Sequence, residues 1–255
     1  MNEELVAQAR MISENIARSL HVPRFYREKA DDVERSLRSF ETHPLVRAGE
    51  KIVLDRIGSY GHGISHARKV AVDAGAIILI EAPAISPPVN VERLLCLSHL
   101  SGLFHDIKRS EPSHAQAGAE ETDRLLKDFD ITGSERKAIT AAIEKHEAFQ
   151  PYSRPEEPAA QLLSGALYDA DKFRWGPDNF TEMIWDIVTP LNIPMEKLLE
   201  HFLPGLKGIE KIRGTFRTAT GKEYGPDFID LGLSIGIRLY EELASQTFYS
   251  SPSPP

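Results

Sequence analysis

The sequence has very little cysteine and no long apolar run. Its single cysteine, Cys96, lies within the mostly apolar stretch 93–104, so we expect a buried thiol in a protein of a reducing compartment. The longest apolar run, Ala74–Ile80, is far shorter than the roughly 20 residues that span a bilayer. Both features argue for a protein that does not enter the membrane.

Positive charge is scarce as well. The chain carries 30 Lys and Arg against 38 Asp and Glu, a formal net charge of −8. Surfaces that bind nucleic acid or anionic membranes need a basic excess, so we expect neither partner. A small phosphorylated substrate stays compatible with this charge, because a metal ion and a few local cations outweigh it. A homo-oligomer is also compatible with the sequence.

The start of the chain lacks the unbroken apolar stretch of a signal peptide. Apolar side chains recur there at helical spacing, with charged side chains opposite: Leu5, Ala9, Ile12, Ile16 and Leu20. We expect this segment to be a packing helix. Together with the single cysteine, this predicts a cytoplasmic protein.

Strand-like alternation joined by tight two-residue turns is missing too. Helical periodicity covers almost the whole chain, so the predicted fold class is all-α. The expected helices are 3–20, 26–40, 44–57, 63–81, 91–107, 114–128, 134–148, 158–174, 178–189, 194–203 and 226–246.

Proline, glycine and polar residues break the helical pattern at 81–90, 149–158 and 214–226. Capping boxes, in which a Ser or Thr is followed three residues later by Gln or Glu, are expected at Ser113 and Thr132. We expect an N-terminal helical extension (1–57) packed on a core (58–176), a C-terminal helical region (177–249) completing the same domain, and a disordered tail (250–255).

Histidines and carboxylates occur on helix faces that are otherwise apolar. His66 begins a stripe that continues with Val70 and Ala74, so it faces the interior. A lone inward histidine is more often a hydrogen-bonded core residue than a ligand. His105-Asp106 changes this balance, because the pair ends the apolar helix VERLLCLSHLSGLF and a negative charge at a helix C-terminus needs a compensating cation.

Three further side chains follow the same pattern. His146 completes the inward stripe of Ile139 and Ile143, and Asp171 shares a face with Leu167. His114 lies at a helix N-terminus, where phosphate is also favoured. Inward imidazoles and carboxylates from separate helices are best explained by a shared cation, and these donors suit Mn, Fe, Zn, Co or Ni.

In this order, His66, His105-Asp106 and Asp171 resemble the H…HD…D signature of the HD-domain phosphohydrolase superfamily. The resemblance runs from about residue 60 to 175. It includes the segments GHGISHARKV, LSGLFHDIKR, SHAQAGAEETDRLL, AIEKHE and YDADKF. A bare HD dipeptide carries no information, whereas five matching segments in order are specific. The resemblance implies an HD-domain helical bundle with N- and C-terminal helical extensions.

The resemblance also implies a ligand set. His66, His105, Asp106 and Asp171 would bind one divalent metal. His114 and His146 match the two further histidines of HD proteins with a second metal, in which Asp106 would bridge both ions. In relatives with one metal, the same two histidines would contact the substrate. The GYP motif of one cyclic-dinucleotide-cleaving class is absent after His146.

The implied activity is hydrolysis of a phosphomonoester or phosphodiester, with a small nucleotide-like or phosphorylated metabolite as substrate. Asp106 holds the metal, and the expected phosphate contacts are Lys108 and Lys172, whereas Arg109 is expected on the solvated surface. His62, Asp169 and Arg174 are candidates for supporting the ligands. The glycine-rich stretch 214–225 is a candidate loop over the site, in which Arg217 and Lys222 could contact phosphate. A plain surface loop is the favoured interpretation of this stretch.

Two other functions use the same scaffold. Some HD-fold proteins, such as myo-inositol oxygenase, hold two irons with the same six positions and cleave bonds with oxygen. A degenerate HD scaffold can act as a binding module without catalysis. We rank hydrolysis first because most HD proteins are hydrolases, an argument by analogy.

Overall fold

The computed structural model of the chain describes residues 3–56 and 63–250, and the side chains of 4–56 and 63–245. Within these ranges the elements are helices and no strand occurs, which confirms the all-α prediction. None of the described helices has the length and apolar composition needed to cross a bilayer.

The helices follow one another with short connections. Their bounds are α1 (Glu3–Arg18), α2 (Arg24–Glu28), α3 (Ala30–Thr42), α4 (Pro44–Leu54), α5 (Ile64–Glu81), η1 (Ala82–Ala84), α6 (Val91–Phe104), α7 (His114–Leu125), η2 (Leu126–Asp128), α8 (Gly133–Glu144), α9 (Pro158–Phe173), the π-helical turn η3 (Asn179–Met183), α10 (Ile184–Val188), α11 (Met195–Ile212) and α12 (Ala219–Ser250).

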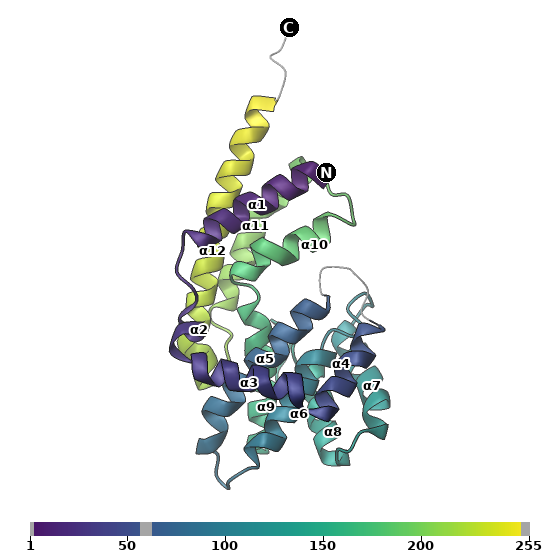
Figure 1. Cartoon of the computed structure of the whole chain (residues 1–255). Coiled ribbons are helices and arrows are strands. Elements are labelled where there is room, and N and C mark those ends of the chain that lie inside the picture. Colours follow the sequence, from purple (N-terminus) through teal and green to yellow (C-terminus); the bar gives the residue numbers. More distant parts are fainter. Residues whose placement is uncertain (1–2, 57–62, 251–255) are drawn as a thin grey trace.

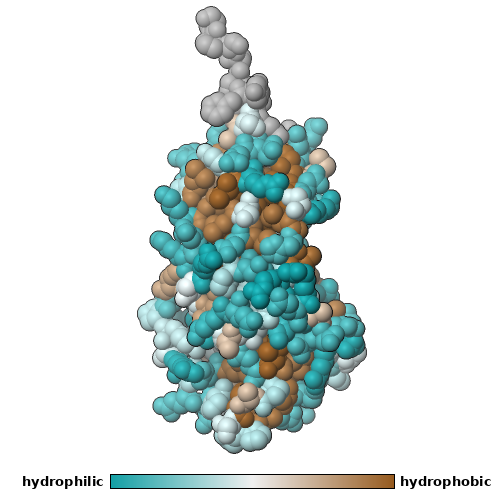
Figure 2. All heavy atoms as spheres, turned by 90° about the vertical axis from the view of Figure 1, so that its left-hand side faces the viewer, coloured by the Kyte–Doolittle hydropathy of each residue, from teal (hydrophilic) through white to brown (hydrophobic). Residues whose placement is uncertain are grey.

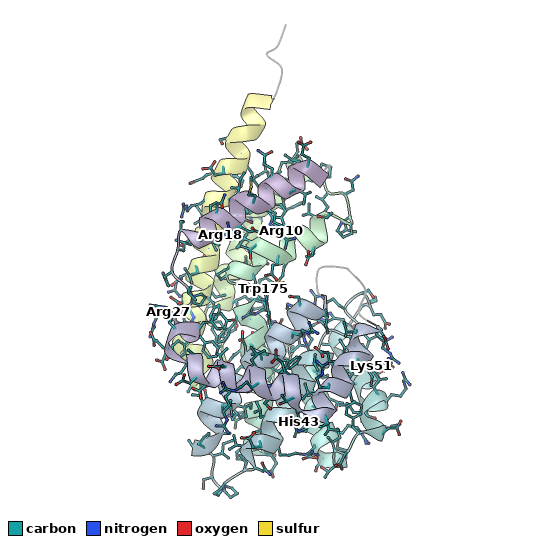
Figure 3. All side chains as sticks on the ribbon, viewed as in Figure 1. Arg10, Arg18, Arg27, His43, Lys51 and Trp175 are labelled. Carbon is teal, nitrogen blue, oxygen red and sulfur yellow. The ribbon has the colours of Figure 1, made fainter. Side chains whose placement is uncertain are left out.

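The helices form two groups, one above the other in Figure 1. The lower group contains α3 to α9, and the upper group contains α1, α10, α11 and much of α12. The long helix α12 connects them, since it packs against α9 and α5 as well as against α1 and α11. Trp175 lies at the junction, with Arg10 and Arg18 of α1 above it and Lys51 of α4 below (Figure 3).

The two groups share one continuous apolar core, which includes residues from α1 to α12. The expected N-terminal extension contributes to both groups: α1 packs on α12 and η3, α3 on α5, and α4 on α6. Apolar side chains also reach the surface at the height of α1 and α12, where they form patches between polar ones (Figure 2).

Helices α5 and α6 form the centre of the lower group. Both are buried on nearly all sides, as their almost continuous apolar sequences require. They approach closely because Gly102 faces the backbone of α5: a Cβ there would lie 2.4 Å from the Ala71 Cα. Since His66 is on α5 and His105 directly follows α6, this close approach brings the two imidazoles together.

Helix α12 begins earlier than the predicted 226, so the predicted loop over 214–225 is wrong for most of its length. The hydroxyl of Thr218 accepts a hydrogen bond from the Gly221 N–H, the bond of a helix N-cap. Gly221 and Gly225 then allow the first turns to pack against Asp169 and the Phe216 ring, which any Cβ would overlap. The glycines therefore serve tight packing and not a flexible loop.

Other helix ends also differ from expectation. The predicted helix 26–40 is two helices, and 194–203 continues to Ile212 because Leu206 and Ile209 extend its buried stripe. The predicted helices 44–57, 91–107, 114–128 and 134–148 end earlier, at residues 54, 104, 125 and 144, and 178–189 consists of η3 and α10.

One of the two predicted capping boxes is present. Thr132 and Glu135 exchange both bonds, with the Glu135 N–H donating to Thr132 Oγ1 and the Thr132 N–H to Glu135 Oε2. Ser113 has a left-handed backbone, with a φ of 55°, and its side chain does not cap α7, so that prediction is wrong. An N-cap serine needs an extended backbone to point its hydroxyl at the helix N–H groups.

We predict that Gly102→Ala lowers the free energy of unfolding by about 1–3 kcal/mol, because α5 and α6 must separate to admit a methyl group. Urea denaturation followed by circular dichroism measures the change. Gly205→Ala in α11 is the matched control: open space surrounds that position, so the helix should gain roughly 0.5–1 kcal/mol. An unchanged midpoint for Gly102→Ala would contradict the close α5–α6 contact.

Candidate metal centre

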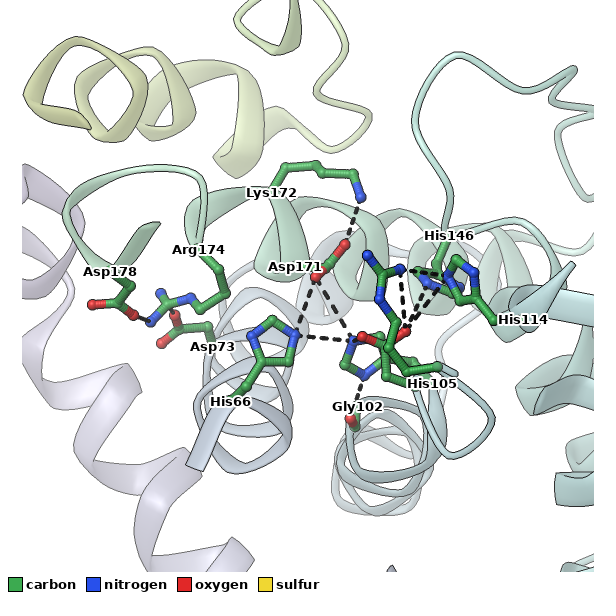
Figure 4. Close-up of polar contacts among 12 residues, drawn as sticks. His66, Asp73, Gly102, His105, His114, His146, Asp171, Lys172, Arg174 and Asp178 are labelled. Atoms are coloured by element: carbon green, nitrogen blue, oxygen red, sulfur yellow. Dashed lines mark hydrogen bonds and ion pairs between the residues drawn. The ribbon is translucent and has the colours of Figure 1, made fainter. Parts of the chain in front are cut away.

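Three side chains from different helices of the lower group point toward one another (Figure 4). His66 projects from the first turn of α5, His105 follows the last residue of α6, and Asp171 belongs to the last turn of α9. His66 Nε2 lies 3.2 Å from His105 Nε2 and 3.4 Å from Asp171 Oδ1. His105 Nε2 is 3.7 Å from the same carboxylate oxygen. All three residues are buried.

These separations are close to those of ligands on one ion. Two donor atoms at about 2.1 Å from a divalent ion are roughly 3.0–3.4 Å apart at right or tetrahedral angles. The His66–His105 and His66–Asp171 distances fall in this range. The group could therefore hold a metal ion with small adjustments of its side chains.

A second group shares His105 with the first. Asp106 Oδ2 lies 3.5 Å from His105 Nε2, and Asp106 Oδ1 lies 3.5 Å from His146 Nε2. His105, Asp106 and His146 are all buried and could also hold an ion. One Asp106 oxygen lies near His105 and the other near His146, so the Asp106 carboxylate connects His146 to the first group.

Backbone hydrogen bonds define the tautomers of two histidines. His105 Nδ1 lies 2.8 Å from the carbonyl oxygen of Gly102, and His146 Nδ1 lies 2.6 Å from that of Ile143. A carbonyl oxygen only accepts, so each Nδ1 carries the proton and donates it. The lone pair of a neutral ring is then on Nε2, the atom that faces the cluster.

Burial and neighbouring groups together set the charges of His105 and Asp171. Burial lowers the pKa of His105 to about 4, against the weaker opposing effect of Asp106 and Asp171, so the ring is neutral at pH 7. Burial alone would raise the pKa of Asp171, but Lys172 and His66 outweigh it and hold that pKa well below its usual range. Neutral imidazole and ionised carboxylate are the forms that bind metal ions.

His114 lies at the edge of the second group. Its Nε2 is 3.6 Å from Asp106 Oδ1, and its Nδ1 lies 2.9 Å from Glu147 Oε1. Arg109 Nη1 lies 2.8 Å from the same Nε2 and 3.9 Å from Asp106 Oδ1. For His114 to bind an ion, the Arg109 side chain would have to turn away. Glu147 was not foreseen, although it directly follows His146.

The two lysines expected at the phosphate are placed differently. Lys172 is buried, and its Nζ lies 2.5 Å from Asp171 Oδ2, so it belongs to the first group. Lys108 instead forms an ion pair with Glu111 at 2.8 Å on the surface. Arg109 is exposed, as expected, and its Nη1 also lies 3.9 Å from Asp106 Oδ1. The turn after α6 brings residue 109 back toward Asp106.

The other candidates have structural contacts. Asp169 accepts hydrogen bonds from the N–H groups of Arg217 and Thr218, so it holds the start of α12 and not the metal cluster. Arg174 is buried in ion pairs with Asp73 and Asp178, beside His66 in Figure 4, and thereby joins α9 to α5. Asp73 gave no signal in the sequence beyond its place in an apolar helix. His62 lies outside the described residues.

Comparison of the chain with known protein families, with curated proteins and with solved structures gave no match.

We predict that His105→Ala abolishes metal binding, because His105 is the one residue common to both groups. Mass spectrometry of the metal content after purification should show the content falling to background, with helical circular dichroism retained. His201→Ala, at an exposed position of α11, is the control that removes an imidazole away from the cluster.

Full metal content in His105→Ala would contradict the shared-ligand arrangement. His146→Ala separates one ion from two: the content should halve if each group holds its own ion. A single ion bound by His66, His105 and Asp171 would leave the content unchanged.

Proposed function

We propose that the chain is a metal-dependent phosphohydrolase of the HD type, which hydrolyses a phosphomonoester or phosphodiester of a small nucleotide-like or phosphorylated metabolite. One observation carries the proposal: His66, His105, Asp106 and Asp171, the residues of the H…HD…D resemblance, converge in space although their helices are far apart in the sequence. A structural role explains one buried histidine, but not two overlapping groups of ligand type.

His66, His105 and Asp171 would hold the ion, with Asp106 and His146 as further ligands. A divalent ion held there would supply Lewis acidity and would activate water for attack at neutral pH. Asp171 and Asp106 supply the negative charge that such an ion requires in a buried site. Lys172 orients Asp171 by its 2.5 Å ion pair.

Substrate would approach from the side of His114 and Arg109. The His105 side chain is fully buried, whereas those of His114 and Arg109 are 15% and 43% exposed. Arg109 has the planar donor pair that matches phosphate oxygens, and charge-assisted bonds of this kind offset the charge that develops on them. His114 can bind the same oxygens or, once Arg109 moves to substrate, a second ion.

The first test is hydrolysis of chromogenic phosphomonoesters and phosphodiesters with added Mn, Co or Ni. We expect turnover by the native chain and a loss of roughly 100-fold or more in Asp106→Ala, because several kcal/mol of transition-state stabilisation leave with the ion. Asp123→Ala, which removes a carboxylate paired with Arg136 on the surface, should keep full activity.

Retained hydrolysis in Asp106→Ala would contradict the proposal. A protein that is purified with iron, consumes oxygen and hydrolyses none of these esters would instead be an oxygenase built on the same ligands. An absorbance spectrum of the purified chain distinguishes the two outcomes.

A second test compares the neighbouring cations Lys108 and Arg109. Arg109→Met should lower kcat/KM by about tenfold or more, the effect of one lost charge-assisted hydrogen bond. Lys108→Met should change it by less than about twofold, because an exposed ion pair with Glu111 contributes little. The reverse order would place the phosphate on the side of Lys108.

A further inference from the structure

A cavity lies along α9, away from the candidate metal ligands. Its volume is about 540 Å³, and its wall combines the end of α5, the connection before α9 and the start of α12. We call it the Arg217 pocket. Its polar lining residues are Glu81, Tyr152, Arg154, Arg217 and Lys222. None of the metal-cluster residues borders it.

Arg217 is held between two aromatic rings. Its guanidinium carbon lies 3.7 Å from the ring centre of Tyr152 and 3.6 Å from that of Tyr168. Stacking of this kind occupies both faces of the planar group and leaves only its N–H edge for a ligand. Among the described residues, the buried Nη1 has no hydrogen-bond partner.

The backbone of Arg217 is fixed as firmly as its side chain. The Asp169 carboxylate accepts hydrogen bonds from the N–H groups of Arg217 and Thr218, both at 2.8 Å, and from the Thr218 hydroxyl. The side chain therefore does not need to be ordered when a ligand binds, which lowers the entropic cost of binding.

The lining is positively charged in an acidic chain. The lining includes three cations, Arg154, Arg217 and Lys222, and one carboxylate, Glu81. The Glu81 carboxylate already accepts a hydrogen bond from the Thr220 N–H at 2.6 Å. The first turn of α9 borders the same cavity at Pro158 and Gln161, with its positive dipole end. Arg217 is partly buried and forms no ion pair with a carboxylate of the described residues. Burial therefore disfavours its positive charge and lowers the pKa of the guanidinium.

We propose that the Arg217 pocket binds an oxyanion, the phosphate or carboxylate group of a small molecule, through the N–H edge of Arg217 with Arg154 and Lys222 beside it. Such a ligand supplies the negative charge that the partly buried guanidinium lacks. A planar guanidinium edge fits two oxygens of one group, which gives the site its preference for oxyanions over halides.

This site is independent of the proposed hydrolysis, although α9 lies between the two. The ring of Tyr168 stacks on Arg217 and also lies 5.1 Å from Lys172 Nζ, which pairs with Asp171. The pocket is therefore to be tested in chelator-treated protein, in which the metal ligands hold no ion that could bind the same anion.

The experiment is calorimetric titration of the full chain, at low ionic strength with chelator, with inorganic phosphate in one arm and succinate in the other. We expect saturable binding of at least one anion, and the stronger arm identifies the group. Arg217→Met keeps the stacking stem and should weaken binding by about tenfold or more. Lys222→Gln, at an exposed position, should weaken it by roughly two- to fivefold even if Arg217→Met does not fold.

Arg213→Gln is the matched control. It removes the same charge four residues earlier, from an exposed pair with Asp230 outside the pocket, and should leave the affinity unchanged. Binding of neither anion overturns the proposal, and so does binding that both Arg217→Met and Lys222→Gln leave intact. Failure of the hydrolysis assay has no bearing on this result, because the titration needs no metal and no turnover.

Discussion

The contact on which the candidate metal centre depends is the close approach of α5 and α6 at Gly102. Because Gly102 has no side chain, the two backbones can meet there. The Gly102 carbonyl oxygen also accepts a hydrogen bond from His105 Nδ1–H. One residue thus determines both the distance from His105 to His66 and the nitrogen with which His105 faces it. A wider helix pair would separate the imidazoles beyond the reach of one ion.

Burying two carboxylates among imidazole rings is costly unless a cation compensates. The chain meets part of this cost itself: Lys172 pairs with Asp171, and Arg109 lies near Asp106. These two cations differ in kind. Lys172 is buried and fixed, so it stays with its carboxylate, whereas Arg109 is partly exposed and can move. This difference makes the Asp106 side the open part of the centre.

Much of the centre could be predicted from the sequence, because helical periodicity shows which side chains face inward. His66, His146 and Asp171 each continue an apolar stripe. The order of His66, His105-Asp106 and Asp171 along the chain gave the resemblance that implied the remaining candidate ligands. Periodicity says nothing of turns. Arg109 follows α6 in a turn that no spacing rule describes, and its contact with His114 depends on where α7 begins. The start of α12 was missed for a related reason: its glycines read as a loop, yet they pack against Asp169 and Phe216 from distant segments.

Helix α9 shows how one element can serve two sites. Residues two apart on a helix point to different sides. Asp171 therefore faces His66 in the candidate metal centre, while Asp169 accepts the N–H hydrogen bond of Arg217. Tyr168 and Lys172 are one turn apart, so they lie on the same face of α9, between the sides that carry Asp171 and Asp169. A shift of α9 along its axis would move Asp171 and the base of the Arg217 pocket by the same amount. Rigid packing of α9 against α5, α8 and α12 is thus a condition for both sites at once.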